Sequence, residues 1–403
     1  MARILPFQGI RPRDDLAGSI IAPPYDVVSE AEARAIVKDN PHSFLHVTRP
    51  EVDLPEGSDP HGPEAYKVAR ANLDRFLSEG WLIQDEAPCF YLYRQSWRGR
   101  TQIGLMAACS IQEYDEGKIK KHELTRPDKE QDRVDHIQAL DAQSGLVFLA
   151  YRDDDAIRRA MAQAEAQAPA WQVITDDGVS HALTPVREPA AIEALQSAFA
   201  EVPALYVADG HHRSAAASRV CAARGGSGRS AWFLAGLFPD SQLRILAYNR
   251  LVRDLAGQTP GRFLAGVNAN FDLDAGVDPV PAARGCWTMY LGGVWYELRA
   301  RRGVVPDDPV GGLDVAVLQD RILAPLLGIA DPRTDQRISF VGGIRGHEAL
   351  SRAVDEGEAA VAFHLHPTGL DQLFAVADAD RLMPPKSTWF EPKLRGGVLL
   401  HQI

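Results

Sequence analysis

The sequence predicts an α+β protein in which mixed sheets pack against helices. Segments with apolar residues at helical spacing alternate along the chain with short apolar runs typical of strands. Hydrophobic residues make up 45% of the chain and charged residues 24%, close to the average for globular proteins. This composition excludes a disordered, collagenous or coiled-coil chain. A length of 403 residues suits two or three domains, or one large one.

Helices are predicted where a capping signal or a helical apolar period is present. Ser29 followed by Glu32 is the pattern of a capping box, and the helix that it opens stops before Pro41. Between 63 and 79, apolar side chains recur at helical spacing, and Gly80 follows as a stop. Further helices are predicted, in order, at both ends of 153–200 and at 214–223, 315–327 and 370–377.

Strands are predicted from short apolar runs bounded by turn residues. The runs 90–97 and 101–111 predict a hairpin that turns at Arg98-Gly99-Arg100, and 286–299 predict another that turns at Gly292-Gly293. The remaining predicted strands are 44–48, 145–151, a pair within 153–200, 205–208, 232–238, 245–247 and 361–365.

Three regions are expected along the chain. Residues 1–150 form an N-terminal α/β region that contains a highly charged segment. Residues 151–200 are rich in Ala and Gln and are expected to be a peripheral insertion. Residues 201–403 form a core that carries two further candidate segments, around 209–213 and 383–393.

Charge and apolar patterning limit the partners of the chain. There are 43 basic and 54 acidic residues, a net charge of −11, and an acidic chain repels phosphate backbones, so no nucleic-acid partner is expected. No apolar run is long enough for a membrane helix, and the start lacks a signal peptide, so we expect a cytoplasmic protein without membrane contact. The four cysteines are far apart and are interpreted as buried small hydrophobes. No pattern indicates an oligomeric state.

The strongest functional candidate is the turn that begins at Asp209, where an apolar strand runs into an alanine-rich helix. A helix start offers free backbone N–H groups and the positive end of the helix dipole, which suit a phosphate. Gly210 permits a sharp turn, and Arg213 can contact two phosphate oxygens at once. The alternative is structural, with Asp209 capping the helix and both histidines exposed. The residues predicted to bind phosphate here are Gly210, His211, His212, Arg213 and Ser214.

Residues 121–133 are the second candidate because side chains suited to catalysis are dense there. His122 or Glu123 could accept a proton as general base, and we favour Glu123 because a carboxylate is already ionised near neutral pH. Lys129 and Arg133 could hold phosphates. Because the charges alternate in sign, the alternative is a solvated, salt-bridged helix face.

Two proline-rich segments complete the set of candidates. Three prolines in 383–393 fix the backbone around two lysines, and this loop could deliver Lys386 to a substrate anion. The alternative is a stiff connector whose aromatic residues pack on the core. In 21–27, two consecutive prolines would hold Tyr25 and Asp26 at a loop tip. Here the alternative is an ordinary surface turn.

These four segments, in this order, resemble the family catalogued as domain of unknown function 1015, and the resemblance spans nearly the whole chain. The residues that carry it are Ala22-Pro23-Pro24-Tyr25-Asp26-Val27-Val28 with Asn40-Pro41-His42-Ser43-Phe44-Leu45, His122-Glu123-Leu124-Thr125-Arg126-Pro127 with Asp132-Arg133, Ala208-Asp209-Gly210-His211-His212-Arg213, and Met383-Pro384-Pro385-Lys386-Ser387-Thr388.

Through Gly210-His211-His212-Arg213, the family is distantly similar to the ParB and sulfiredoxin superfamily. In that superfamily the corresponding turn lies at a helix start and binds nucleotide phosphates. Its members include partitioning nucleotide hydrolases, sulfiredoxins and free-serine kinases. His211 stands where sulfiredoxins have their catalytic cysteine, and the acidic chain lacks the basic surface of the partitioning proteins. The resemblance therefore implies a ParB/sulfiredoxin-like nucleotide-binding core with additional α/β layers, nearest to the serine-kinase branch.

That branch implies phosphoryl transfer between a nucleotide, ATP or ADP, and a small hydroxyl metabolite, with free serine or phosphoserine as the preferred substrate and Mg²⁺ as cofactor. The alternative is a nucleotide-binding regulatory module with little turnover. The roles expected are catalysis for Glu123, His122 and Asp209; Mg²⁺ binding for Asp209; phosphate binding for Lys386, Lys129 and Arg133 beside the turn residues; and substrate binding for Tyr25, Asp26, Thr125 and Arg126.

Overall fold

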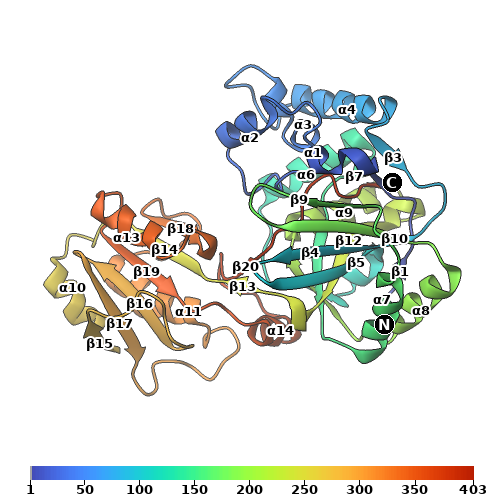
Figure 1. Cartoon of the computed structure of the whole chain (residues 1–403). Helices are drawn as coiled ribbons and strands as arrows, with labels where there is room; N and C mark the ends of the chain where they lie inside the picture. Colours follow the sequence, from blue (N-terminus) through green and yellow to red (C-terminus); the bar gives the residue numbers. More distant parts are fainter. Residues whose placement is uncertain (1) are drawn as a thin grey trace. The chain divides into compact units, whose positions relative to one another are not determined.

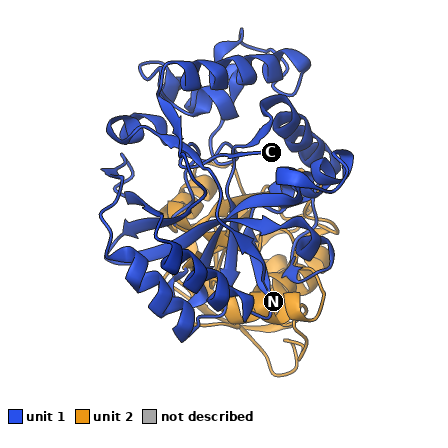
Figure 2. Cartoon of the chain, turned by 90° about the vertical axis from the view of Figure 1, so that its right-hand side faces the viewer, with its two compact units in different colours: residues 1–243, 392–403 blue, residues 244–391 orange. Residues whose placement is uncertain are grey.

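The structure, a computed structural model, describes residues 2–403 and confirms a mixed α/β fold. Its contacts divide the chain into two compact units, coloured separately in Figure 2. Unit 1 contains the residues up to Leu243 together with 392–403, and unit 2 contains Arg244–Glu391. The chain therefore leaves unit 1 for unit 2 and returns to unit 1 for its last strand.

A nine-stranded mixed sheet runs through unit 1 within residues 2–403 (Figure 1). Its strands, in spatial order, are β6 (Ile119–Lys120), β11 (Leu205–Asp209), β8 (Val147–Tyr151), β12 (Trp232–Pro239), β5 (Arg100–Ser110), β4 (Phe90–Trp97), β10 (Ser180–Val186) and β9 (Trp171–Ile174), with β1 (Ile4–Leu5) beside β5.

Strand direction in this sheet is mixed. The predicted hairpin is confirmed as β4 and β5, which pair antiparallel up to Trp97 opposite Arg100. In contrast, β6 runs parallel to β11, and β8 runs parallel to β12. The parallel pair β6–β11 lies at one edge of the sheet and positions the candidate site described below.

The helices of unit 1 begin where the sequence supplies caps. The capping box is confirmed: Oγ of Ser29 accepts from the N–H of Glu32 at 3.2 Å, and Oε2 of Glu32 accepts from the N–H of Ser29 at 2.7 Å. The helices are α1 (Ala17–Ile20), α2 (Glu30–Val37), α3 (Leu45–Thr48), α4 (Pro63–Ser78), α5 (Ile111–Asp115), α6 (Pro127–Leu140), α7 (Asp155–Glu165), α8 (Pro189–Ala200) and α9 (His211–Ala223). Two short ladders join β2 (Ile10–Pro12) to β3 (Leu82–Gln84) and β7 (Ala142–Gln143) to β21 (His401–Gln402).

The strand predicted at 44–48 is wrong, because these residues form α3. The run is apolar and only five residues long, and such a run does not distinguish a buried strand from a buried helical turn. The N–H of Thr48 bonds the carbonyl of Phe44, and the Thr48 hydroxyl bonds the same oxygen at 3.2 Å. Local hydrogen bonds therefore satisfy this segment without a neighbouring strand.

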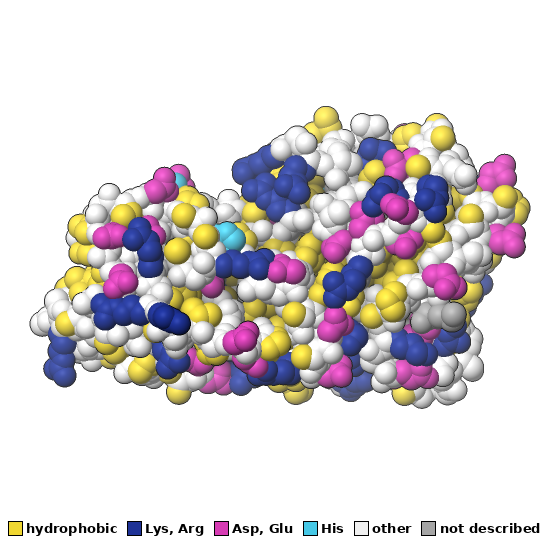
Figure 3. All heavy atoms as spheres, turned by 90° about the horizontal axis from the view of Figure 1, so that it is seen from below, with side chains coloured by type: hydrophobic (Ala, Val, Ile, Leu, Met, Phe, Trp, Pro, Cys, Tyr) yellow, Lys and Arg dark blue, Asp and Glu magenta, His cyan; other side chains and the backbone are white. Residues whose placement is uncertain are grey.

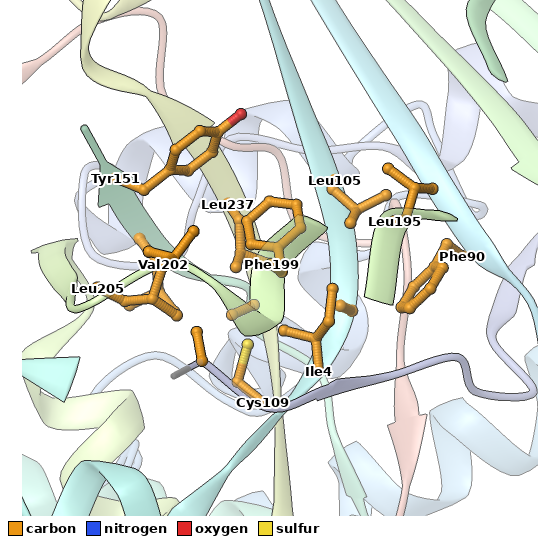
Figure 4. Packing of buried hydrophobic residues seen from close by; sticks show 14 of the residues in the cluster. Ile4, Phe90, Leu105, Cys109, Tyr151, Leu195, Phe199, Val202, Leu205 and Leu237 are labelled. Atoms are coloured by element: carbon orange, nitrogen blue, oxygen red, sulfur yellow. The ribbon is translucent and has the colours of Figure 1, made fainter. Parts of the chain in front are cut away.

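The main core of unit 1 lies between the sheet and the pair α7 and α8. Figure 4 shows Phe199 of α8 among buried side chains of several strands, including Leu105, Leu237 and Tyr151. A second helical layer, made of α4, α6 and α9, packs through smaller clusters, in one of which Val134 and Ile137 of α6 meet Ala216 and Val220 of α9.

The division of unit 1 differs from the three regions expected from the sequence. β8 ends at the expected boundary of 150, and β11 begins just after the boundary of 200, yet the two are paired neighbours in one sheet. Residues 151–200, expected to be peripheral, supply β10 as the neighbour of β4 and two helices to the core. Local pattern locates strands, but it does not say which of them pair across long stretches of chain.

Unit 2 is built on an antiparallel sheet of six strands within residues 244–391. The hairpin predicted at 286–299 is confirmed, and the helix predicted at 315–327 is observed as two helices joined by a π-helical stretch, Gln319–Leu323. In spatial order the strands are β15 (Phe271–Ala275), β17 (Val294–Ala300), β16 (Cys286–Leu291), β19 (Val361–Leu365), β14 (Tyr248–Val252) and β18 (Ile338–Gly342), with a separate ladder of β13 (Ile245–Leu246) and β20 (Trp389–Phe390). The helices are α10 (Pro260–Val267), α11 (Asp314–Leu318), α12 (Ala324–Leu327), α13 (Glu348–Asp355) and α14 (Leu370–Asp378).

The surface carries charges of both signs. On the face shown in Figure 3, Lys and Arg side chains are interspersed with Asp, Glu and apolar side chains. Within residues 2–403, none of the helices combines the length and the apolar character that crossing a bilayer requires. Of the four cysteines, Cys286 is only partly buried, whereas the other three are buried as expected.

A buried histidine in the sheet should make stability depend on pH. His181 on β10 is fully buried, and its ring nitrogens meet the hydroxyls of Tyr93 at 2.7 Å and Thr175 at 3.1 Å. Burial, helped by the charge of Arg395, lowers the pKa of His181 to about 3. The unfolded chain binds a proton at this residue near pH 6.5, so the free energy of unfolding should fall as pH drops below that value, by about 1.4 kcal/mol per pH unit for this group.

We expect a His181→Phe variant to lose that part of the pH dependence. The measurement is urea unfolding of both proteins at intervals between pH 6 and 4, with the slope of unfolding free energy against pH as the readout. The variant should be less stable near pH 7 because it lacks two hydrogen bonds, and the difference from the wild type should shrink as pH falls. Equal slopes would mean that His181 titrates alike in the folded and unfolded chains.

Candidate functional site

The parallel pairing of β6 with β11 brings two candidate segments together. In the register, Ile119 lies opposite Leu205 and Lys120 opposite Tyr206. Parallel strands end at the same edge of a sheet, so the residues that follow them emerge side by side. Residues 121–123 therefore lie next to residues 207–211, although more than eighty positions separate them in the sequence.

The start of α9 is open toward this edge. Gly210 is the N-cap residue, with a positive φ of 95°, and no side chain caps the helix. The N–H of Ser214 makes the first helical bond, to the carbonyl of Gly210 at 3.0 Å, so the amides of residues 211–213 precede the intrahelical bonding pattern. The helix starts three residues earlier than the sequence predicted, since glycine allows the chain to turn directly from strand into helix.

Two buried imidazoles meet at this edge. His122 and His211 are 2% and 5% exposed, and their rings lie edge to face with centroids 4.5 Å apart. Burial lowers the pKa of His122 to about 4, and burial together with the neighbouring His122 holds the pKa of His211 well below its usual value. Both rings are therefore neutral near pH 7. His211 does not have the solvent exposure that the structural alternative required.

Glu123 is the accessible member of this group. Its carboxylate Oε2 lies 3.9 Å from Nδ1 of His211, and its side chain is 38% exposed. Of the two bases considered from the sequence, Glu123 is thus open to a ligand, whereas His122 is enclosed.

His212 has a structural contact in this arrangement. Its Nε2 accepts a hydrogen bond from the N–H of Arg126 at 3.0 Å, which ties the start of α9 to the residue that precedes α6. The Arg126 guanidinium pairs on the surface with Asp128 at 2.8 Å. The Thr125 hydroxyl donates to Glu130 at 2.8 Å. His212 and Thr125 thus help to hold the loop that presents Glu123.

Arg213 points into unit 1. Its NH1 donates to the carbonyl of Leu146, its NH2 donates to Oδ2 of Asp209 at 3.0 Å, and Asp26 lies 3.8 Å away. The side chain is only 10% exposed. A Cβ on Gly145 would come within 2.9 Å of the Arg213 side chain, so the glycine makes room for it. These contacts occupy the guanidinium that the sequence suggested as a phosphate clamp.

Asp209 has a second cationic neighbour, Lys393. The Lys393 Nζ lies 3.7 Å from Oδ2 of Asp209. Burial acts to raise the pKa of this carboxyl, but Lys393 and Arg213 outweigh it and hold the pKa well below its usual range. The sequence analysis favoured Lys386 from the same proline-rich segment and did not single out Lys393. The signal that could have found it is the Pro392-Lys393 pair, where proline fixes the backbone just before the lysine.

Arg133 and Tyr25 form a neighbouring group. The Arg133 guanidinium lies over the Tyr25 ring, 4.1 Å from its centroid, and its Nε donates to Asp132 at 2.8 Å. Asp132 also accepts from His61 at 2.6 Å and from Tyr66 at 2.9 Å. The solvated helix face considered for this segment therefore applies to its first turn but not to Asp132 and Arg133, which are buried.

A small cavity separates Arg133 from Arg213. It has a volume of about 40 Å³ and is lined by both arginines, Tyr25, Ser144 and Arg395, among others. A space of this size holds a few waters.

Three further predicted residues are Ser214, Lys129 and Lys386. The Ser214 hydroxyl is buried and bonds the carbonyl of His211 at 3.1 Å, within its own helix. Lys129 is exposed on the first turn of α6. Lys386 belongs to unit 2, where its carbonyl accepts from Arg250 at 3.1 Å and its Nζ lies 5.6 Å from the centroid of the Tyr248 ring.

Fold and site together define an α/β protein with histidine and carboxylate groups at the open start of a helix. A family model described as "Protein of unknown function (DUF1015)" matches residues 4–316. The chain belongs to this family, which confirms the resemblance. Three of its four segments lie within the matched residues, whereas Met383–Thr388 lies outside them. No curated protein matches the chain in sequence.

Several solved structures are similar to this chain at low sequence identity. A free serine kinase variant in complex with AMP is 8% identical, with a TM-score of 0.37, over 71% of this chain and 87% of that one. SbnI with a C-terminal truncation, from Staphylococcus aureus, is 12% identical, with a TM-score of 0.39, over 72% of this chain and 85% of that one. A conserved hypothetical protein from Pyrococcus furiosus is 10% identical, with a TM-score of 0.35, over 71% of this chain and 90% of that one.

Proposed function

We propose that this chain binds a nucleotide by its phosphates at the start of α9 and transfers a phosphoryl group between that nucleotide and a small hydroxyl metabolite. Free serine and phosphoserine are the first candidates for the metabolite, and ATP or ADP for the nucleotide. The observation that carries the proposal is the meeting, at one edge of the sheet, of an uncapped helix start with Lys393 and two carboxylates, Asp209 and Glu123.

Phosphate binding in this proposal rests on the backbone and on one lysine. The amides of residues 211–213 and the positive end of the α9 dipole favour an anion. Lys393 adds a full positive charge next to Asp209. In this proposal Arg213 does not contact the phosphate. It supports the site indirectly, because it donates hydrogen bonds to Asp209 and to the Leu146 carbonyl. Lys129 and Arg133 are proposed as further phosphate contacts.

The oxygen donors at this edge fit Mg²⁺. The contacts of Asp209 with Arg213 and Lys393 are made by Oδ2, and Oδ1 is the oxygen that we propose for a hard cation. Asp209 would hold the ion, and bound Mg²⁺ would neutralise charge on the transferred phosphoryl group.

Glu123 is the proposed acceptor of the proton from the substrate hydroxyl. It is partly exposed and adjoins the helix start, whereas His122 is buried beneath it. Tyr25, Asp26, Thr125 and Arg126 surround the same region in the proposal and would contact the polar groups of the metabolite. The reaction would take place in the cytoplasm, where ATP and ADP are available.

Lys393→Met tests the binding step. Calorimetric titration with ADP and Mg²⁺ should show a ten- to hundredfold loss of affinity, because a charge-assisted contact to phosphate contributes about 1.5–3 kcal/mol. The matched control is Lys67→Met, the same change at an exposed lysine on α4, which should bind like the wild type. Unchanged affinity in Lys393→Met would place the phosphates elsewhere.

A turnover assay separates an enzyme from a sensor. Wild-type protein is incubated with Mg²⁺ and either ATP or ADP, with and without serine. The reverse direction is assayed with phosphoserine, with and without AMP or ADP as the phosphoryl acceptor, and the products are resolved by chromatography. Conversion that needs both partners supports the transferase. Tight nucleotide binding without conversion would favour a regulatory module that senses the nucleotide.

A further inference from the structure

The strongest unexplained feature of unit 1 is a pair of buried histidines in which three ring nitrogens lack a partner within hydrogen-bond geometry. Within residues 2–403, these are both ring nitrogens of His122, which has the Val207 backbone nearby, and Nε2 of His211. Leaving such groups buried and unsatisfied costs free energy. Most other buried histidines of the unit do have partners, as at His136, whose Nε2 meets the carbonyl of Val47 at 3.0 Å.

A third donor completes the group. One ligand atom each from His122, Glu123 and His211 lie within 4.8 Å of one another. Zinc binds histidine nitrogen and carboxylate oxygen at about 2.0–2.2 Å, so ligand atoms on one ion are separated by roughly 3.4 Å at tetrahedral angles. The observed separation of 3.9 Å between Nδ1 of His211 and Oε2 of Glu123 is too long for a hydrogen bond and close to that spacing.

The backbone fixes these three side chains in advance. His122 and Glu123 follow β6 directly, His211 opens α9, and the parallel pairing of β6 with β11 sets their separation. The rings are oriented edge to face, at 89°, so that their nitrogens can converge from different directions. Little conformational entropy remains to be lost on binding an ion, which favours affinity.

The donor chemistry selects a class of ion. Two neutral imidazoles and one carboxylate are ligands for Zn²⁺ and other divalent transition metals, whereas Mg²⁺ prefers oxygen donors and retains water. Three protein ligands leave at least one coordination position open, as in catalytic and not structural zinc sites. The open position would be on the side of Glu123, the only partly exposed member of the three.

We propose that His122, Glu123 and His211 form a binding site for a divalent transition-metal ion, with Zn²⁺ as the representative ion. This site is distinct from the oxygen site proposed for Mg²⁺ at Asp209, and it does not depend on the nucleotide proposal. Glu123 has two carboxylate oxygens, so one can coordinate the metal while the other faces a substrate hydroxyl.

The test is a Zn²⁺ titration of the full chain after chelator treatment, with no nucleotide present. Competition with a chromophoric chelator should reveal one tight site per chain, and millimolar Mg²⁺ should not displace the ion. Co²⁺ in place of Zn²⁺ should give visible absorption bands of a site with nitrogen ligands. His122→Ala and His211→Ala should each weaken the tight site at least a hundredfold.

The matched control is His61→Ala, which removes an exposed histidine outside the group and should retain the tight site. Because a buried variant could fail to fold, a second readout uses the wild type alone, whose melting temperature should rise with Zn²⁺ but not with Mg²⁺. No tight site, equal losses in His61→Ala and His211→Ala, or equal stabilisation by both ions would overturn the proposal. The Zn²⁺ titration uses no nucleotide, so a failure to bind nucleotide in a separate assay would not change its outcome. Likewise, a failure to bind Zn²⁺ would not contradict the proposed nucleotide binding.

Discussion

Replacing Glu123 by Gln should reduce kcat for phosphoryl transfer by about 10²–10⁴ while nucleotide affinity changes less than twofold. The substitution preserves the shape of the side chain and removes its ability to take up a proton, and general-base catalysis typically contributes this much to rate. The carboxylate lies beside the helix start but is not among the groups proposed to hold phosphate. Kinetics with saturating nucleotide and varied serine, together with calorimetry, would measure both quantities.

The matched control for this substitution is Glu116→Gln. Glu116 is exposed and pairs with Lys118 at 2.8 Å, so the variant should turn over like the wild type. Wild-type turnover in Glu123→Gln would remove Glu123 from the role of base. Loss of nucleotide binding with unchanged stability would make it a binding residue instead.

Arg213→Ala should destabilise unit 1 strongly. The guanidinium bonds the carbonyl of Leu146 and the carboxylate of Asp209, and its side chain is 10% exposed. The substitution leaves the buried Leu146 carbonyl without this donor, which typically costs about 1–3 kcal/mol, and it leaves Asp209 with Lys393 as its remaining cationic neighbour. Urea unfolding followed by circular dichroism would measure the change, with Arg219→Ala, an exposed arginine on the same helix, as control.

The competing expectation comes from the sequence, where Arg213 looked like a phosphate ligand. If that role holds, Arg213→Ala unfolds near the wild-type midpoint but loses nucleotide affinity about ten- to a hundredfold. A double-mutant cycle with Asp209→Asn separates the two cases, since a structural pair gives strongly non-additive changes in unfolding free energy. Additive changes would contradict the structural role assigned here.

Much of the secondary structure was readable from local signals. The capping box at Ser29 and the arginine–glycine turn at residues 98–100 were predicted correctly because each signal involves neighbouring residues. The segment 44–48 was not, because its helical turn depends on burial that a five-residue pattern does not encode.

The candidate site was predictable in its parts but not in its geometry. Asp209, His211 and Glu123 were chosen by residue type, and the fold brings their segments together through the pairing of β6 with β11. That pairing joins distant segments through backbone hydrogen bonds. Strand β6 has only two residues, and their side chains do not predict that it pairs with β11. The inward direction of Arg213 and the approach of Lys393 to Asp209 depend on the same long-range contacts.

The return of the chain to unit 1 has a consequence for the order of biosynthesis. Lys393 and β21 belong to residues 392–403 of unit 1, and the rest of unit 1, up to Leu243, is made before unit 2 begins. At roughly 5–20 residues per second, a ribosome needs about 7–30 s to make the intervening unit. During that interval Asp209 faces Arg213 without Lys393, and β7 lacks its partner strand. Until residues 392–403 are made, unit 1 lacks Lys393 and the strand β21. A pause in translation within unit 2 would therefore prolong the exposure of this incomplete unit to chaperones and proteases.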